Sequence, residues 1–255
     1  MRRIRVSIVA SLVLLVLPLI AQDEESFDLI FLRGRVVDGT GNPWSSADIG
    51  VRGDRIARIG NLSDAVARRV VDAEGLVVAP GFIDPHTHAV RGIFDVPTAD
   101  NYLLQGVTTL TEGNDGSSPF PIAAHLAQIA ETEISPNWAV FVGQGTIRRE
   151  VLGTDDREPT LPELDQMRAL VAEAMQEGAL GLSTGLFYVP GSFTSTDEVI
   201  ELSRIAATHG GIYISHLRDE AQYLLDSVKE TIRIGKEAGL PVQMTHHKVI
   251  SRDMW

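Results

Sequence analysis

The chain of 255 residues contains no cysteine, which excludes disulfide bonds and thiolate metal ligands. Cationic side chains are also scarce, because 22 Lys and Arg stand against 34 Asp and Glu, for a formal net charge of −12. This balance argues against nucleic acid as a partner, since phosphate binding requires a concentrated basic surface. The remaining composition, 44% hydrophobic and 22% charged, is ordinary for a folded globular protein.

Long hydrophobic runs are missing except near the N-terminus. Three arginines within the first five residues precede an apolar run at 6–20, which ends in Ala21 before an acidic stretch. We predict that residues 1–21 are a secretory signal peptide cleaved after Ala21, and that the protein is exported to the periplasm or the extracellular space. An uncleaved membrane anchor is the alternative, but the run is shorter than the ~20 residues that a span usually needs.

Residues 22–80 contain short segments rich in Val and Ile, separated by turn residues such as Gly, Asn and Asp. The predicted strands are 29–32, 35–37, 49–51, 56–59, 70–71 and 76–78. These strands predict a small N-terminal β-domain that needs further strands from elsewhere to complete its core.

From residue 81 the pattern changes to apolar strands that alternate with amphipathic helices. The predicted strands are 82–83, 107–110, 139–142, 180–182, 212–214 and 242–244. Capping boxes at Thr160 with Glu163 and at Ser195 with Glu198 predict helix starts, and a third helix ends near Gly239. Regular alternation of this kind indicates an α/β fold with a parallel sheet.

Six strand–helix units are visible, and the last of them is only a strand. Because eight units form a (β/α)8 (TIM-like) barrel, residues 81–255 predict an incomplete barrel of about six strands, truncated at the C-terminus.

Histidines stand at the ends of three of these strands. His86 and His88 follow the first strand two residues apart, which points both imidazoles to one side. His216 and His246 end the fifth and sixth strands, and the ends of parallel strands converge at the barrel mouth. Four imidazoles gathered there predict a zinc site. The alternative for the first pair is two polar residues that merely end a strand.

Three other histidines are interpreted as structural. His247 would face away from its neighbour, whereas His125 and His209 lie within or at the end of helical patterns.

A site for two metal ions needs an anionic bridging ligand. Residues 181–185, at the fourth predicted strand, contain no lysine that a modification could convert into such a ligand. The turn after the second strand offers Asp115 or, failing that, Glu112, because carboxylate oxygens also bind zinc. Either carboxylate could instead orient the turn.

These motifs together resemble the D-aminoacylase (N-acyl-D-amino-acid deacylase) branch of the amidohydrolase superfamily, from about Asp28 to Trp255. The matching segments are 80–88, 106–109, 178–186 with 188–191, 215–218 with Glu220, and 246–248. The resemblance implies a β-sandwich fused to a metal-bearing (β/α)8 barrel, one or two zinc ions, and hydrolysis of the amide of N-acyl-D-amino acids.

The resemblance also assigns residues. It places His86, His88, His216 and His246 at metal-ligand positions, and Tyr188 and Lys248 where such enzymes hold the substrate carboxylate. Arg218 is a weaker candidate for the substrate carboxylate and could equally be a structural partner of Asp219 or Glu220.

Two departures from the family pattern bear on these expectations. The family often has Gly-Asn-Cys-Gly after the second strand, with the cysteine as a metal ligand, where this chain has Asp115. The family's catalytic aspartate lies beyond the seventh strand, so a general base is expected beyond Trp255 and little turnover from these 255 residues alone. The rival interpretations are a D-residue dipeptidase, a cyclic-amide hydrolase, and a metal-binding relic without catalysis.

Overall fold

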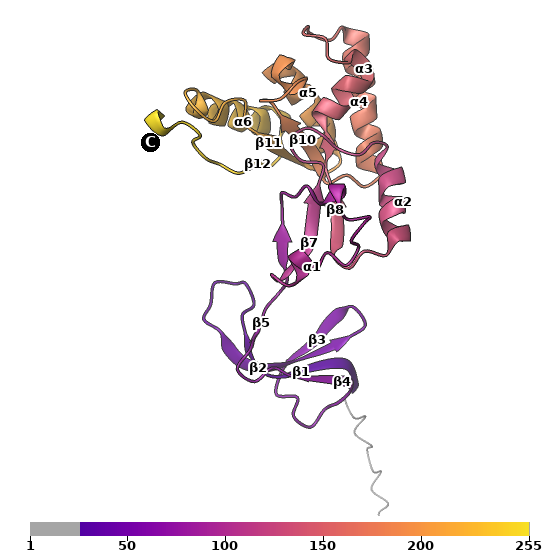
Figure 1. Ribbon diagram of the computed structural model, residues 1–255, viewed down its shortest axis with the longest axis vertical. Helices are drawn as coiled ribbons and strands as arrows, with labels where there is room; N and C mark the ends of the chain where they lie inside the picture. The colour runs from indigo at the N-terminus through magenta and orange to yellow at the C-terminus, as the bar shows by residue number, and fades with distance from the viewer. Residues whose placement is uncertain (1–25, 255) are drawn as a thin grey trace, which may run out of the picture. The chain divides into compact units, whose positions relative to one another are not determined.

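The computed structural model describes residues 26–254, so the predicted signal peptide lies outside the described residues. Within them, no helix combines the length and the apolar character needed to cross a membrane. Contacts divide the chain between residues 80 and 81 into two compact units. Each unit is described by itself (Figure 1).

The first unit is one five-stranded sheet. Its strands are β1 (Ser26–Val36), β2 (Ser45–Arg52), β3 (Arg55–Gly60), β4 (Val66–Asp72) and β5 (Val77–Val78). The order is β3-β2-β1-β4, with β5 also paired to β1. The sequence predicted two strands, 29–32 and 35–37, in the region where β1 runs unbroken. Arg33, at φ 61°, lies at an irregularity in the register with β2, and the chain does not turn there.

A β-sandwich requires a second sheet, and the described residues of this unit form a single one. Apolar side chains on β3 and β4, among them Ile56, Ile59 and Val70, are exposed. The small core contains Phe27, Ile30 and Leu62. The sandwich therefore stays a prediction.

The second unit confirms the predicted α/β fold. Its strands are β6 (Phe82–Asp84), β7 (Val107–Glu112), β8 (Asn137–Val140), β9 (Val142–Gly143), β10 (Gly181–Gly185), β11 (Ile212–His216) and β12 (Val242–Met244). All pairings are parallel, in the orders β6-β7-β8 and β9-β10-β11-β12. Only Phe141 separates β8 from β9, so the strand predicted at 139–142 is interrupted there, and its two parts belong to the two sheets.

Helices connect these strands. They are α1 (Asp100–Leu103), α2 (Ile122–Thr132), α3 (Gln144–Leu152), α4 (Leu161–Gln176), α5 (Thr196–Thr208) and α6 (Leu224–Ala238), with short 3-10 turns η1 (Ala89–Arg91), η2 (Gly191–Phe193) and η3 (Arg252–Met254). The predicted capping box is confirmed at α4, where the Thr160 amide donates to Glu163 Oε2 over 2.7 Å. The predicted end of α6 is confirmed too, since Gly239 caps it at φ 76°.

The core of this unit lies where helices α3, α4 and α5 cover β9, β10 and β11 (Figure 1). Met167 and Val171 of α4 and Leu182 of β10 are completely buried there. This apolar layer fixes the strands from outside, so their carboxyl ends are free to carry polar side chains.

Candidate metal centre

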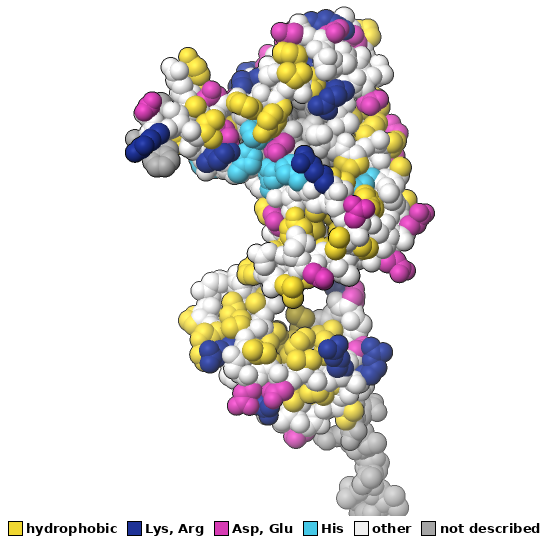
Figure 2. Space-filling model, in the orientation of Figure 1, with side chains coloured by type: hydrophobic (Ala, Val, Ile, Leu, Met, Phe, Trp, Pro, Cys, Tyr) yellow, Lys and Arg dark blue, Asp and Glu magenta, His cyan; other side chains and the backbone are white. Residues whose placement is uncertain are grey.

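The polar side chains predicted from the sequence meet at the carboxyl ends of the strands. His86 and His88 follow β6, Asp115 follows β7, His216 ends β11, and His246 follows β12. Parallel strands end at the same rim, which brings residues 160 positions apart to one place. Figure 2 shows histidine side chains gathered on one face of this unit.

Asp115 lies at the centre of this cluster, and its two carboxylate oxygens face different histidines. Oδ2 is 3.5 Å from His86 Nε2 and 3.3 Å from His88 Nε2. Oδ1 is 3.5 Å from His216 Nδ1 and 3.8 Å from His246 Nε2. The result is two groups of three potential ligands that share one carboxylate.

The backbone holds Asp115 in a strained conformation, at φ 55°. Aspartate tolerates this left-handed region better than most residues do. The turn is fastened to β10, because Ser183 Oγ donates to the Gly113 carbonyl and accepts from the Gly116 amide over 3.2 Å. Strand β10, which contains no lysine, thus supports the Asp115 turn through Ser183.

The electrostatics of the cluster favour a charged carboxylate. Burial alone would raise the pKa of Asp115, but the adjacent imidazoles of His216 and His86 lower that pKa below its ordinary value. Asp115 is therefore an anion at neutral pH and is available as a metal ligand.

The unsatisfied atoms of the cluster fit a divalent cation. Asp115 Oδ1 and His216 Nδ1 are buried and have no hydrogen-bond partner, although they face each other. His86 Nε2 and His88 Nε2 also face each other, 3.3 Å apart. Buried lone pairs without a donor are costly, and imidazole nitrogens with a carboxylate oxygen are ordinary zinc ligands.

Glu112, the alternative carboxylate, is placed elsewhere. It is fully buried and accepts from Thr87 Oγ1 over 2.7 Å and from the Val90 amide over 3.2 Å. Burial raises its pKa, and the hydrogen bonds from Thr87 and the backbone partly offset that rise. Glu112 thus orients the turn after β6, so of the two candidate carboxylates the structure brings Asp115 to the histidines.

Tyr188 and Lys248 border the cluster, as the resemblance implied. The Tyr188 ring centroid lies 4.7 Å from that of His216, and the side chain is half-exposed. Burial, followed by the charge of Asp115, raises the pKa of Tyr188, so its phenol is protonated at neutral pH. Lys248 Nζ lies 2.9 Å from His246 Nδ1.

Arg218 is occupied away from the cluster. Its guanidinium donates to both oxygens of Glu230, at 2.8 and 3.0 Å, and to the carbonyl of Thr194. The suggested pairing with Asp219 or Glu220 is therefore wrong, because the partner comes from α6. The remaining histidines also lie outside the two ligand groups: His125 accepts from Trp138 Nε1, and His209 and His247 are exposed.

Sequence reasoning missed one site residue, Glu220. It was noted only as part of a motif and as a partner for Arg218, yet it is buried against His246 and Lys248. Its position four residues after His216 was the available signal.

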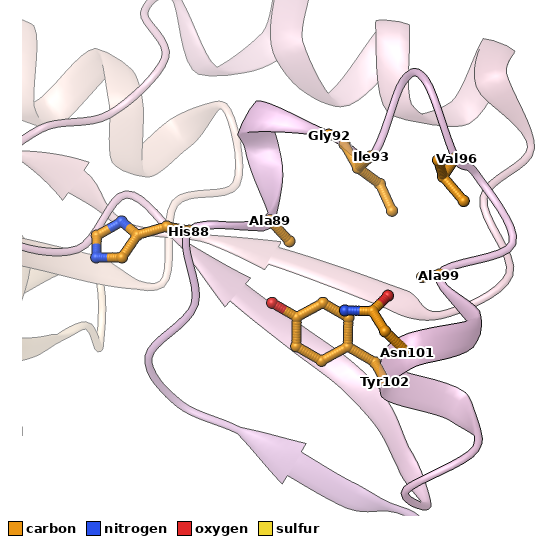
Figure 3. A pocket seen from close by; sticks show the side chains of 8 residues that line it. All are labelled: His88, Ala89, Gly92, Ile93, Val96, Ala99, Asn101 and Tyr102. Atoms are coloured by element: carbon orange, nitrogen blue, oxygen red, sulfur yellow. The ribbon is translucent and has the colours of Figure 1, made fainter.

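A pocket of about 260 Å³ adjoins the cluster between η1 and α1. Its lining residues are His88, Ala89, Gly92, Ile93, Val96, Ala99, Asn101 and Tyr102. Figure 3 shows the His88 ring directed away from the other lining side chains. The pocket therefore neighbours the candidate metal centre and has His88 in common with it.

A parallel α/β sheet that gathers four imidazoles and one carboxylate at its carboxyl rim has the form of a barrel protein with a metal-binding site at the strand ends. Residues 69–252 match the Amidohydrolase family, and the chain belongs to that family.

Individual relatives agree with this assignment. The D-aminoacylase of Alcaligenes xylosoxydans xylosoxydans is 41% identical over 90% of this chain and 52% of its own length. A solved D-aminoacylase structure, concerned with the role of its binuclear metal centre, is 39% identical with a TM-score of 0.85, over 90% of this chain and 53% of that chain. The N-acyl-D-glutamate deacylase of Bordetella bronchiseptica, solved with zinc and a phosphonate inhibitor, is 34% identical with a TM-score of 0.86, over 91% and 53%. The chain thus spans about half the length of the relatives it matches.

The close packing of the Asp115 turn predicts the outcome of a glycine substitution. A Cβ on Gly116, at φ 73°, would lie 2.6 Å from the Gly185 amide nitrogen. Gly116→Ala should therefore lower the urea midpoint of unfolding clearly more than Gly210→Ala does. Gly210 is the matched control, because it has φ 74° with no atom within 4 Å of a Cβ. Equal midpoints for the two variants would show that the turn has room to move.

Proposed function

We propose that the complete protein is a zinc-dependent hydrolase that cleaves the amide bond of N-acyl-D-amino acids. The single observation that carries this proposal is the position of Asp115, whose two oxygens each face a pair of imidazoles. The relatives support it further, since those named above are deacylases of this class or were solved with metal.

The ligand groups would be divided as follows. One ion would be held by His86, His88 and Asp115 Oδ2, and a second by Asp115 Oδ1, His216 and His246. When bound, zinc supplies a Lewis acid that makes hydroxide available near neutral pH and polarises the scissile carbonyl.

The chain's own residues would position the substrate. The Lys248 ammonium is a cationic hydrogen-bond donor at the border of the cluster, and the protonated Tyr188 phenol is a neutral one. Both donors suit the carboxylate of an N-acyl amino acid. In the reaction, water adds to the amide carbon, the C–N bond breaks, and a proton passes to the leaving amine. That transfer requires a general acid–base, a role to which none of the residues described above is assigned.

Metal content and activity test the proposal directly. The purified complete protein should contain zinc and release acetate from several N-acetyl-D-amino acids. His86→Ala combined with His88→Ala should remove ligands and abolish turnover, whereas His209→Ala, which changes an exposed helix-end histidine, should leave both unchanged. A metal-free protein, or full activity in the double variant, would contradict the proposal.

The choice between the two carboxylates gives a second test. Asp115→Ala should reduce the zinc content of the purified protein, because it removes an oxygen ligand from both groups. Glu112→Gln should retain zinc, because an amide oxygen can still accept from Thr87 and Val90. Zinc lost from the Glu112 variant and kept in the Asp115 variant would reverse the assignment.

A substrate panel that adds cyclic amides and D-residue dipeptides to the N-acetyl-D-amino acids distinguishes the rival functions. Cleavage of cyclic amides or of dipeptides with a D-residue, without release of acetate, would indicate another amidohydrolase. The absence of lysine at residues 181–185 argues against the cyclic-amide option. Bound zinc without any turnover would indicate a metal-binding relic.

We also propose that the protein is exported, on the basis of its basic start, its apolar run and the small residue Ala21. Sequencing of the N-terminus of protein recovered from the periplasm or the medium should begin at Gln22. A protein retained in the cytoplasm with Met1 or Arg2 at its N-terminus would contradict export.

A further inference from the structure

Glu220 lies directly behind the second ligand group, in the segment between β11 and α6. Its side chain is 5% exposed, and its two oxygens have different partners. Oε1 is 3.0 Å from His246 Nδ1, and Oε2 is 2.6 Å from Lys248 Nζ and 3.8 Å from His216 Nε2.

The two histidines of this group therefore each lie between two carboxylates. His216 presents Nδ1 to Asp115 and Nε2 to Glu220. His246 does the reverse, presenting Nε2 to Asp115 and Nδ1 to Glu220. One carboxylate thus faces the metal side of both rings, and the other faces their far side.

A neutral imidazole has one protonated nitrogen and one lone pair, and only the lone pair binds metal. For His246 to bind through Nε2, its proton must be on Nδ1 and must be donated to an acceptor. Two groups lie near Nδ1: the Glu220 carboxylate, which accepts, and the Lys248 ammonium 2.9 Å away, which only donates. A hydrogen bond from Lys248 would require the Nδ1 lone pair and would place the proton on the metal side.

We propose that Glu220 is the positioning residue that sets the tautomer of His246 in favour of metal binding. Its second oxygen binds the Lys248 ammonium and so keeps that cation from competing for His246 Nδ1. The proposal rests on the proposed zinc site. It assigns to Glu220 a role toward the metal and also toward the lysine expected to hold the substrate.

Zinc affinity of the complete protein, measured by chelator competition, tests this role independently of activity. Glu220→Gln should weaken zinc binding about 10- to 100-fold, the usual effect of losing a partner behind a metal-ligating histidine. An amide has an acceptor oxygen at one end and a donor nitrogen at the other, so it cannot replace both carboxylate oxygens, one of which faces His246 and the other Lys248. Glu230→Gln is the matched control: it removes another carboxylate that pairs with a cation, here Arg218, and zinc affinity should be unchanged.

Removal of Lys248 shows whether Glu220 acts by setting the His246 tautomer or only by stabilising the local structure. With Lys248→Met added to Glu220→Gln, the amide oxygen is free to accept from His246, so most of the lost zinc affinity should return. Lys248→Met alone should bind zinc at least as tightly as the unmodified protein, and it serves as the test if Glu220→Gln does not fold.

The outcomes are distinguishable from those that test the proposed function. An unmodified protein without zinc would contradict the zinc site itself. Zinc bound by the unmodified protein and equally well by Glu220→Gln would overturn only the role of Glu220. The same holds if the double variant binds as weakly as Glu220→Gln, or if Lys248→Met alone weakens binding.

Discussion

One carboxylate held in an unfavourable backbone conformation organises the candidate metal centre. Asp115 at φ 55° points its two oxygens to two different pairs of histidines. Such a conformation persists only when its surroundings impose it, and here Ser183 and the closely packed Gly113 and Gly116 do so. This turn places one shared anion among the four imidazoles.

The polar residues around the rim support this centre in layers. Below it, Glu112 accepts from Thr87 and orients the turn that carries His86 and His88. Behind it, Glu220 faces both His216 and His246. Hydrogen bonds to a buried carboxylate or hydroxyl thus fix the segments that carry His86 with His88, Asp115 and His246. An apolar layer of helices holds the strands from outside.

The use of aspartate at position 115 has a chemical consequence. In the pattern that the chain resembles, this turn often carries a cysteine, a softer ligand with one binding atom. A carboxylate offers two oxygens, and the structure directs one to each histidine pair. This geometry suits two cations, and the harder oxygen ligands favour harder metals than a thiolate would.

The sequence by itself determined the alternation of strands and helices, the capping of α4 by Thr160 and Glu163, and the four strand-end histidines, because these follow from local periodicity and spacing. Tertiary structure alone decided which carboxylate joins the histidines, since the positions of Asp115 and Glu112 depend on how the β7 turn packs against β10. The same holds for the pairing of Arg218 with Glu230 and the place of Glu220 behind two rings. These contacts join side chains from different elements, and their energies depend on burial and orientation that no local pattern encodes.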